Sequence, residues 1–157
     1  MKKLIEFKPI GVIHTPFRTK EECPIQFSFA AKIMGSVDVL EEYTEGLLDI
    51  EGFSHLYLIY LFDRAGRVEM VRHTFLDDNP HGIYASRHPC RPNSIGLSIV
   101  ELIERRDNVL KIKGVDMLDE TPLLDIKPYI PRFDSIESAS EGWVKDREWR
   151  PKPEGRE

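Results

Sequence analysis

An unbroken apolar and aromatic run, HLYLIYLF at residues 55–62, is the feature that most constrains the fold. Its length and its Leu, Ile and Tyr content are typical of a buried β-strand. Because the run does not alternate with polar residues, we expect a central strand that is buried on both faces. His55 is expected to be a core histidine with a polar partner. Leu56, Leu58, Tyr60 and Phe62 then form either core or a subunit interface, and we expect core.

Five further segments have strand character, through alternation or β-branched content. They are residues 7–13, 31–39, 82–86, 95–105 and 109–115. The last two are joined by Arg106, Asp107 and Asn108, which favours a hairpin. The sequence therefore predicts a mainly β protein: a single small β-barrel domain with short helices and long loops.

Helix signals are few. Residues 41–48 favour a turn or two, and residues 135–149 favour one short helix that begins at Asp134, with Glu137 completing a capping box. The stretch 62–82 lacks periodicity and is expected to be a long loop of the kind that covers a site. The barrel domain is expected over residues 1–149, followed by a flexible tail, 150–157, that is rich in proline and charge.

Charge and cysteine content limit the function classes. A net charge of −5 argues against a protein whose whole surface binds nucleic acid. Arginines and histidines nevertheless outnumber acids between residues 64 and 91, which indicates either a basic mouth on an acidic body or a solvated mixed face. Two cysteines, Cys23 and Cys90, form no C-x-x-C pair, so a reducing compartment is expected and a metal is not.

The opening MKKLIEFKPIG is too poor in apolar residues for a signal peptide, and no apolar run is long enough to span a bilayer. We therefore expect a cytoplasmic protein with no membrane partner.

Residues 82–98, GIYASRHPCRPNSIGLS, place two arginines and two prolines between strand-like runs. Arg87 and Arg91 offer planar forks of donors that suit carboxylate or phosphate. Pro89 and Pro92 restrict the backbone that presents them. These residues predict a rigid binding loop.

A second dense block lies at residues 114–135, GVDMLDETPLLDIKPYIPRFDS. Asp116 or Asp119 can accept hydrogen bonds from ribose hydroxyls or an ammonium group. The alternative is that Asp119 and Thr121 only make a turn. Asp125 and Lys127 are expected to form a structural ion pair.

Several site types lack their sequence signatures. The chain contains no nucleophile elbow, no G-x-G-x-x-G fingerprint and no Gly-Lys-Ser/Thr phosphate loop. The sequence therefore does not indicate a covalent hydrolase or a Rossmann enzyme. His81, His88 and Cys90 would make at most an irregular metal site, which we do not favour.

Four segments together resemble the TsaA-like family. They are IGVIHTPF at residues 10–17, EGFSHLYLIYLF at 51–62, SRHPCRPNSIGLS at 86–98, and the block at 114–135. The resemblance implies a small β-barrel that binds S-adenosyl-L-methionine, forms a homodimer with the cofactor pocket near the subunit interface, and holds no metal. Bacterial members methylate N6 of threonylcarbamoyladenosine at position 37 of tRNA.

The resemblance also assigns roles to individual residues. The implied cofactor contacts are Gln26, Phe27, Ser28, Asp63, Arg64, Arg87, Leu97, Ser98, Asp116, Met117, Leu118 and Asp119. For a tRNA methyltransferase, Arg87, Arg91 and Asn93 are the expected substrate-binding residues, with the arginines holding a carboxylate or phosphate. The catalytic base is expected among Asp63, Tyr84 and Asp119, and the sequence does not choose between them.

The chain departs from the family pattern at three places. Asp63-Arg64 replaces His-Gln, Cys90 and Ser94 replace Phe and Pro around Arg-Pro-Asn, and Glu120 replaces a glycine. A glutamate is sterically more strained than a glycine in a left-handed backbone conformation. Bacterial members also carry an extra C-terminal domain, and this chain stops soon after the expected barrel.

Three functions follow as hypotheses. The first is the tRNA methyltransferase activity. The second keeps the cofactor but transfers the methyl group to a small metabolite or another nucleoside. The third is a non-enzymatic S-adenosyl-L-methionine sensor.

Overall fold

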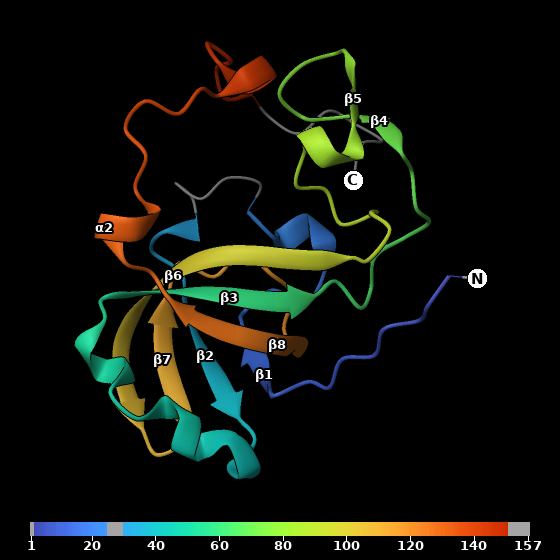
Figure 1. Ribbon diagram of the computed structural model, residues 1–157. Coiled ribbons are helices and arrows are strands. Elements are labelled where there is room, and N and C mark those ends of the chain that lie inside the picture. Colours follow the sequence, from blue (N-terminus) through green and yellow to red (C-terminus); the bar gives the residue numbers. More distant parts are fainter. Residues whose placement is uncertain (1, 25–29, 151–157) are drawn as a thin grey trace.

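In the computed structural model, which describes residues 2–24 and 30–150, a closed barrel of six antiparallel strands forms the centre of the molecule (Figure 1). Around the barrel the strands follow the order β1-β2-β7-β6-β3-β8. Their bounds are β1 Gly11–His14, β2 Met34–Val39, β3 His55–Leu61, β6 Ile95–Arg106, β7 Val109–Lys113 and β8 Thr121–Pro128. The predicted mainly β barrel is confirmed.

Strand β3 pairs with β6 and β8 along its length. Its side chains alternate, with Leu56, Leu58 and Tyr60 buried and the residues between them only partly buried. The prediction of burial on both faces is therefore wrong, because a barrel has one interior and its outer face meets solvent. His55 accordingly lies on the partly exposed face, with its ring Nδ1 2.8 Å from the Ser54 hydroxyl.

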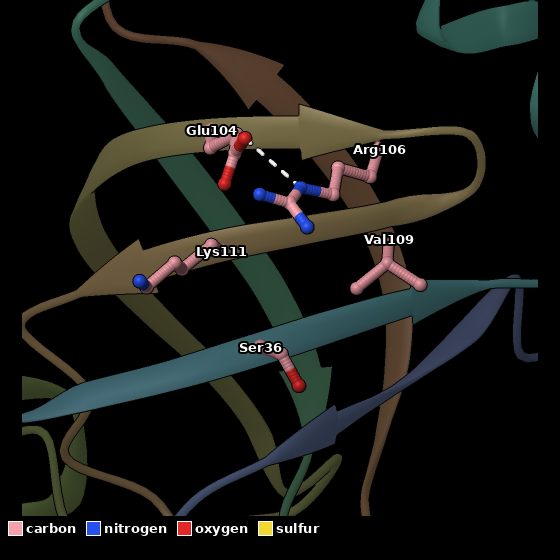
Figure 2. A pocket seen from close by; sticks show the side chains of 5 residues that line it. All are labelled: Ser36, Glu104, Arg106, Val109 and Lys111. Carbon is pink, nitrogen blue, oxygen red and sulfur yellow. Dashed lines mark hydrogen bonds and ion pairs between the residues drawn. The ribbon is translucent and has the colours of Figure 1, made fainter.

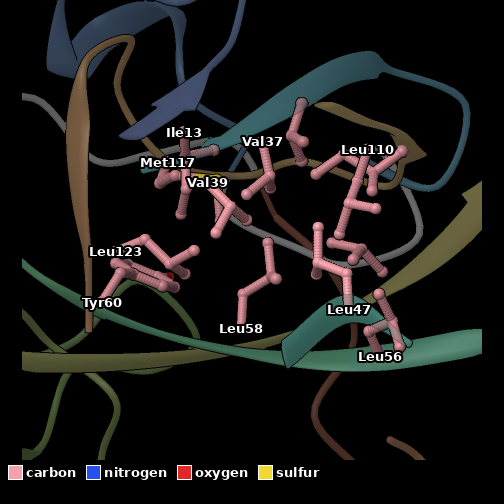
Figure 3. Close-up of a cluster of buried hydrophobic side chains, with 13 residues drawn as sticks. Ile13, Val37, Val39, Leu47, Leu56, Leu58, Tyr60, Leu110, Met117 and Leu123 are labelled. Carbon is pink, nitrogen blue, oxygen red and sulfur yellow. The ribbon is translucent and has the colours of Figure 1, made fainter. Parts of the chain in front are cut away.

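The barrel interior is filled by aliphatic side chains from all six strands (Figure 3). Fully buried members are Ile13, Val37, Leu56, Leu58, Val100, Leu110, Ile112 and Leu123. Leu47, from the 3-10 helix η2 (Glu41–Leu47), closes one end of this core. The expectation that Leu56, Leu58 and Tyr60 form core is confirmed, while Phe62 is partly buried and packs against this core.

Antiparallel pairing around a closed barrel decides where the loops lie. Strands β1, β3 and β7 end at the same rim at which β2, β6 and β8 begin, and we call this rim the loop end. The segments 15–33, 62–94 and 114–120 all connect strands there. The opposite end carries segment 40–54, with η2 and η3 (Ile50–Gly52), and the tight turn at Asp107 and Asn108.

Segment 62–94 is more ordered than expected. It contains a small hairpin of β4 (Val71–His73) and β5 (Pro80–Gly82), followed by the 3-10 helix η4 (Ile83–Ala85). The strand predicted over 82–86 is therefore wrong. The chain turns instead, with the N–H of Ser86 bonded to the Ile83 carbonyl, and the Ile83 side chain is buried.

The helix predicted over residues 135–149 is also wrong. The chain forms the short α2 (Pro131–Asp134) and later the 3-10 helix η5 (Gly142–Val144). Asp134 accepts the Ile130 N–H and closes α2 instead of starting a longer helix. Gly142 and Asp146 have φ of 57° and 62°, which a right-handed helix excludes. The first strand likewise begins at Gly11, later than predicted.

Residues 142–150 instead lie along the β4–β5 hairpin, and we call them the C-terminal strap (Figure 1). The Trp143 ring stacks on His81 with centroids 3.8 Å apart, and its indole N–H donates to the Ala85 carbonyl at 2.7 Å. Arg147 pairs with the buried Asp77 at 3.5 Å. Arg150, the only described residue of the predicted tail, donates to the Phe75 carbonyl.

Candidate functional site

The loop end gathers the side chains that the sequence singled out. Arg64, just after β3, donates from Nη2 to the main-chain carbonyl of Asp119 at 2.6 Å and lies 3.4 Å from the Thr121 hydroxyl. The N–H of Asp119 in turn donates to the carbonyl of Phe17 at 2.7 Å. Three segments far apart in sequence are therefore tied together around Asp119.

The carboxylate of Asp119 is held from the β1 side. The Thr15 N–H donates to it at 3.0 Å, and His14 Nδ1 lies 3.4 Å away. Burial alone would raise the pKa of Asp119, but the main-chain N–H groups of Thr15 and Glu120, together with His14, lower it below its ordinary value. His14 also reaches Asp38 through Nε2, at 3.4 Å. Asp119 is thus an ionised, well-anchored acceptor.

Asp116 has the opposite electrostatic character. It follows β7 and accepts the Ser98 hydroxyl at 2.7 Å, and Ser98 lies 2.9 Å from the Tyr60 hydroxyl. Burial raises the pKa of Asp116, while the Ser98 hydrogen bond and the charge of Arg87 oppose the rise. Arg87 therefore lies near enough to interact electrostatically with this carboxylate.

Not every predicted cofactor residue faces the same space. Leu97 and Ser98 are neighbours on β6, so their side chains point to opposite faces. Ser98 is 7% exposed and inside the barrel, whereas Leu97 is 55% exposed and outside it. Met117 packs in the barrel core, and its carbonyl accepts the Thr15 hydroxyl. Leu118 is partly buried, and its carbonyl accepts the Thr121 hydroxyl.

Within the predicted binding loop, residues 86–94 are stabilised by hydrogen bonds among themselves. Arg91 donates from Nη1 to the Ser86 carbonyl at 3.0 Å, and the Arg91 carbonyl accepts the Ser94 N–H. The Arg91 guanidinium thus braces the loop, whereas Arg87 and Asn93 are exposed. Ser94 has φ of 47°, a value closed to proline, so the serine that replaces the family's proline permits this backbone.

The three candidate bases occupy different surroundings. Asp63 is exposed and its carboxylate lies 3.2 Å from Arg64 Nε, so Arg64 connects Asp63 to the Asp119 loop. Tyr84 is 73% exposed on η4. Among the described residues, no hydrogen bond or ion pair joins Tyr84 to Asp63 or Asp119. Gln26, Phe27 and Ser28 lie outside the described residues.

The departure at Glu120 carries a backbone penalty. Its φ is 61°, in the left-handed region that glycine adopts without a Cβ clash. The turn is retained because Asp119 and Thr121 on either side are hydrogen-bonded to Thr15 and Leu118. Asp119 and Thr121 do lie in a turn. Asp119 is also hydrogen-bonded to Thr15 and Arg64, so it does more than form this turn.

A surface hollow of about 310 Å³ lies on the outer face of β2, β7 and β6, lined by Ser36, Glu104, Arg106, Val109 and Lys111 (Figure 2). A Glu104–Arg106 ion pair of 2.9 Å crosses part of it. None of the residues predicted for the site lines this hollow. The Asp125–Lys127 pair, at 3.2 Å on the outer face of β8, is confirmed as an ion pair.

No group of three or more His, Cys, Asp and Glu residues within residues 2–24 and 30–150 is arranged to hold a metal ion. Neither Cys23 nor Cys90 takes part in a disulfide bond within the described residues. None of the helices described is long and apolar enough to cross a membrane.

Sequence reasoning missed several members of the loop-end cluster. Tyr60 was assigned only to the core, and His14, Thr15 and Thr121 had no site role. A tyrosine in an aliphatic inward stripe is a usable signal, because a buried hydroxyl needs a partner. The partners of Thr15 and Thr121 are main-chain atoms and leave no residue pattern.

Comparison with known proteins agrees with this geometry. The model of the tRNA-methyltransferase O N-terminal domain family matches residues 12–135. The chain belongs to this family. The resemblance to the TsaA-like family is thereby confirmed.

Relatives of the chain include a probable S-adenosyl-L-methionine-binding protein of Pyrococcus abyssi, 49% identical over 142 residues, which cover 90% of this chain and 77% of the relative. A tRNA (adenine(37)-N6)-methyltransferase of Escherichia coli is 35% identical, over 89% of this chain and 64% of that enzyme. A crystal structure of TrmO from Pseudomonas aeruginosa superposes with a TM-score of 0.75 at 34% identity, over 90% of this chain and 63% of that one. The chain thus spans somewhat less than two thirds of these methyltransferases.

Proposed function

We propose that this protein binds S-adenosyl-L-methionine and transfers its methyl group to N6 of threonylcarbamoyladenosine at position 37 of tRNA. Family membership and the names of the relatives support both the cofactor binding and the methyl transfer to tRNA. The observation that carries it is the meeting of segments 62–64, 86–98 and 114–121 at one barrel rim, because the family resemblance assigns cofactor contacts to these segments.

The donors and acceptors at the loop end fit this cofactor. S-adenosyl-L-methionine carries an ammonium group, ribose hydroxyls and a carboxylate. Asp116 and Asp119 supply carboxylate acceptors for the first two, and Arg87 supplies a cation for the carboxylate. The proposed cofactor residues remain those assigned from the sequence, with the Met117 contact made by the main chain because its side chain is buried.

The bound cofactor supplies an electrophilic methyl group on a sulfonium. The acceptor N6 is conjugated to a carbonyl and is a poor nucleophile, so the protein must align it with the methyl carbon. As the nitrogen–carbon bond forms and the carbon–sulfur bond breaks, the N6 proton must pass to a base. Alignment and proton removal are therefore the two tasks of the protein's own residues.

Asp63 is the candidate base that the geometry supports best. It is exposed beside Arg64, which connects it to the Asp119 loop. Asp119 is a weaker choice, since its lowered pKa and its bonds to Thr15 and His14 reduce its basicity. Tyr84, on η4, makes no hydrogen bond or ion pair with either of these carboxylates within the described part of the chain.

Arg87 and Asn93 remain proposed substrate contacts, because both are exposed at the same loop. Arg91 contributes by bracing that loop through Ser86. Arg87→Ala is expected to reduce turnover at least tenfold with little change in Tm, whereas Arg91→Ala should reduce both. Equal Tm in the two variants would contradict the bracing role.

A homodimer is proposed from the outer face of β3 and β6. Ile59, Ile95, Leu97 and Ile99 share this face, and Ile95 and Leu97 are 39% and 55% exposed. A second copy docked here would bury that surface and bring Leu97 toward the partner's cofactor. Leu97→Asp should then give a monomer in light scattering, while Leu48→Asp, equally polar but at the opposite barrel end, should not.

A tRNA substrate implies a cytoplasmic location. The cofactor-binding domain is proposed to comprise residues 1–149, and the hydrogen bond from Arg150 to Phe75 adds one more residue to its contacts.

The test is incubation with methyl-labelled S-adenosyl-L-methionine and tRNA from cells that make, or do not make, the threonylcarbamoyl modification. Labelled nucleoside only from the modified tRNA supports the proposal. Calorimetric cofactor binding without any labelled nucleoside contradicts the tRNA activity and favours a different acceptor or a sensor. Binding to tRNA should weaken steeply with salt, whereas a neutral small acceptor would be nearly indifferent.

A further inference from the structure

Three hydroxyl and carboxyl side chains form a continuous hydrogen-bonded chain inside the loop end of the barrel. Tyr60 comes from β3, Ser98 from β6, and Asp116 from the segment after β7. The Tyr60 and Ser98 oxygens are 2.9 Å apart, and the Ser98 hydroxyl donates to Asp116 Oδ1 at 2.7 Å. Tyr60 is 3% exposed and Ser98 7%. Such a chain is an exception in an aliphatic core, since buried polar groups are costly unless satisfied.

The backbone is shaped to admit the Tyr60 ring. Gly96 is the cross-strand partner of Tyr60, and a Cβ at Gly96 would overlap the ring atoms. Phe62 packs against the same ring edge-on, with centroids 5.3 Å apart. The ring is thus in contact with Gly96 on β6 and with the Phe62 ring, and its hydroxyl lies beside Ser98.

The direction of the hydrogen bonds follows from counting protons. An ionised Asp116 can only accept hydrogen bonds, so the Ser98 hydroxyl donates its single proton to Asp116. The Tyr60 hydroxyl must then donate to the Ser98 oxygen. Burial, together with the Asp116 charge, raises the pKa of Tyr60, which keeps its proton in place. Among the described residues, Arg87 and Cys23 also influence this chain electrostatically.

We propose that Tyr60 is a positioning residue that acts through Ser98 to hold the Asp116 carboxylate in the orientation that binds S-adenosyl-L-methionine. This inference rests on the proposed cofactor binding. Donation from Tyr60 polarises the Ser98 hydroxyl and strengthens its bond to Asp116. Removing the Tyr60 hydroxyl leaves a buried acceptor on Ser98 unsatisfied and loosens the carboxylate.

Tyr60→Phe tests the proposal because the ring, and therefore the packing on Gly96 and Phe62, is kept. Tyr43→Phe is the matched control, since Tyr43 also packs against the core but lies on η2, at the opposite end of the barrel. Calorimetry with S-adenosyl-L-methionine should give about fivefold weaker binding for Tyr60→Phe at neutral pH and unchanged binding for the control. The loss should grow as the pH falls, because the weakened Ser98 bond raises the pKa of Asp116 further.

A second readout needs no cofactor. Carbon-13 NMR of the Asp116 carboxyl in the unliganded protein should show its pKa raised in Tyr60→Phe and in Ser98→Ala, relative to wild type. A wild-type titration in both variants would overturn the positioning role, even if one of them binds cofactor poorly. Failure of the wild-type protein to bind S-adenosyl-L-methionine would overturn the proposed function, and the Asp116 titration would then still decide whether Tyr60 controls this carboxylate.

Discussion

The guanidinium of Arg64 donates a hydrogen bond to the main-chain carbonyl of Asp119 across 55 residues of sequence, with Nη2 and O 2.6 Å apart. This contact joins the end of β3 to the turn before β8. Arg64 stands where the family pattern has a glutamine, so the departure noted in the sequence is the residue that makes the link. The planar guanidinium reaches the Asp63 carboxylate as well, from Nε.

Replacing Arg64 should therefore loosen the site more than the fold. Arg64→Ala is expected to weaken S-adenosyl-L-methionine binding about tenfold, the scale of one lost hydrogen bond from a charged donor. Arg64→Lys should recover little of it, because an ammonium cannot reproduce the planar fork. Calorimetry measures the affinity, and Arg67→Ala, an exposed arginine of the same segment, is the control. Equal affinity in Arg64→Ala and wild type would refute the link.

The ionised Asp116 carboxylate is expected to lower the stability of the folded protein and to contribute to cofactor binding. Because burial raises its pKa above the ordinary 3.8, the folded state holds this proton more tightly than the unfolded state. Its contribution to stability is thus complete below pH 3.8 and is lost as the pH rises through the folded-state pKa. At neutral pH, Asp116→Asn should raise Tm by roughly 2 to 4 °C, for about 1 kcal/mol, and should abolish tight cofactor binding.

Asp119→Asn is the control, because its Tm is expected to change in the opposite direction. The pKa of Asp119 is lowered in the folded state, so its ionised form contributes stability above pH 3.8 that is lost as the pH falls through the folded-state value. Asp119→Asn should therefore lower Tm at pH 7. Thermal melts between pH 3 and pH 8 measure both variants, and the same sign of change in both at pH 7 would contradict the assignment.

Glu120→Gly should stabilise the protein. The residue sits at φ 61°, where a Cβ costs about 1 kcal/mol, partly offset by the extra freedom that glycine gives the unfolded chain. Chemical denaturation should show a small gain in the free energy of unfolding. Glu120→Ala, which removes the carboxylate but keeps the Cβ, should show none. A gain in the alanine variant alone would mean that charge, and not backbone strain, is the cost.

The C-terminal strap should hold the β4–β5 hairpin in place. Trp143→Ala removes both the stack on His81 and the hydrogen bond to Ala85, so hydrogen exchange of residues 71–85 should accelerate. Trp143→Phe keeps a ring for the stack and loses only the N–H, and its effect should be smaller. Unchanged exchange in Trp143→Ala would show that the hairpin is held by its own contacts.

Sequence patterns predicted the strands whose side chains alternate or run apolar, because burial in a barrel depends on local hydrophobic spacing. The hairpin at 95–115 and the core stripe of Leu56, Leu58 and Tyr60 were found in this way. The helix expected over 135–149 was wrong because Asp134 closes α2 instead of capping a helix that follows it. Farther along the segment, Trp143 packs on His81, a contact between distant residues that the local pattern does not show.

By itself, the sequence determined the barrel class, the family and the residue types at the loop end, since these follow from periodicity and from motifs along one chain. Only the tertiary structure decided which of those residues meet. The closure of six antiparallel strands puts three connecting segments at one rim, and there it sets Asp119 between Arg64 and His14 and opens a position for the Tyr60 ring over Gly96. Contacts to main-chain carbonyls and close ring packing depend on distances between strands, which no spacing in the sequence records.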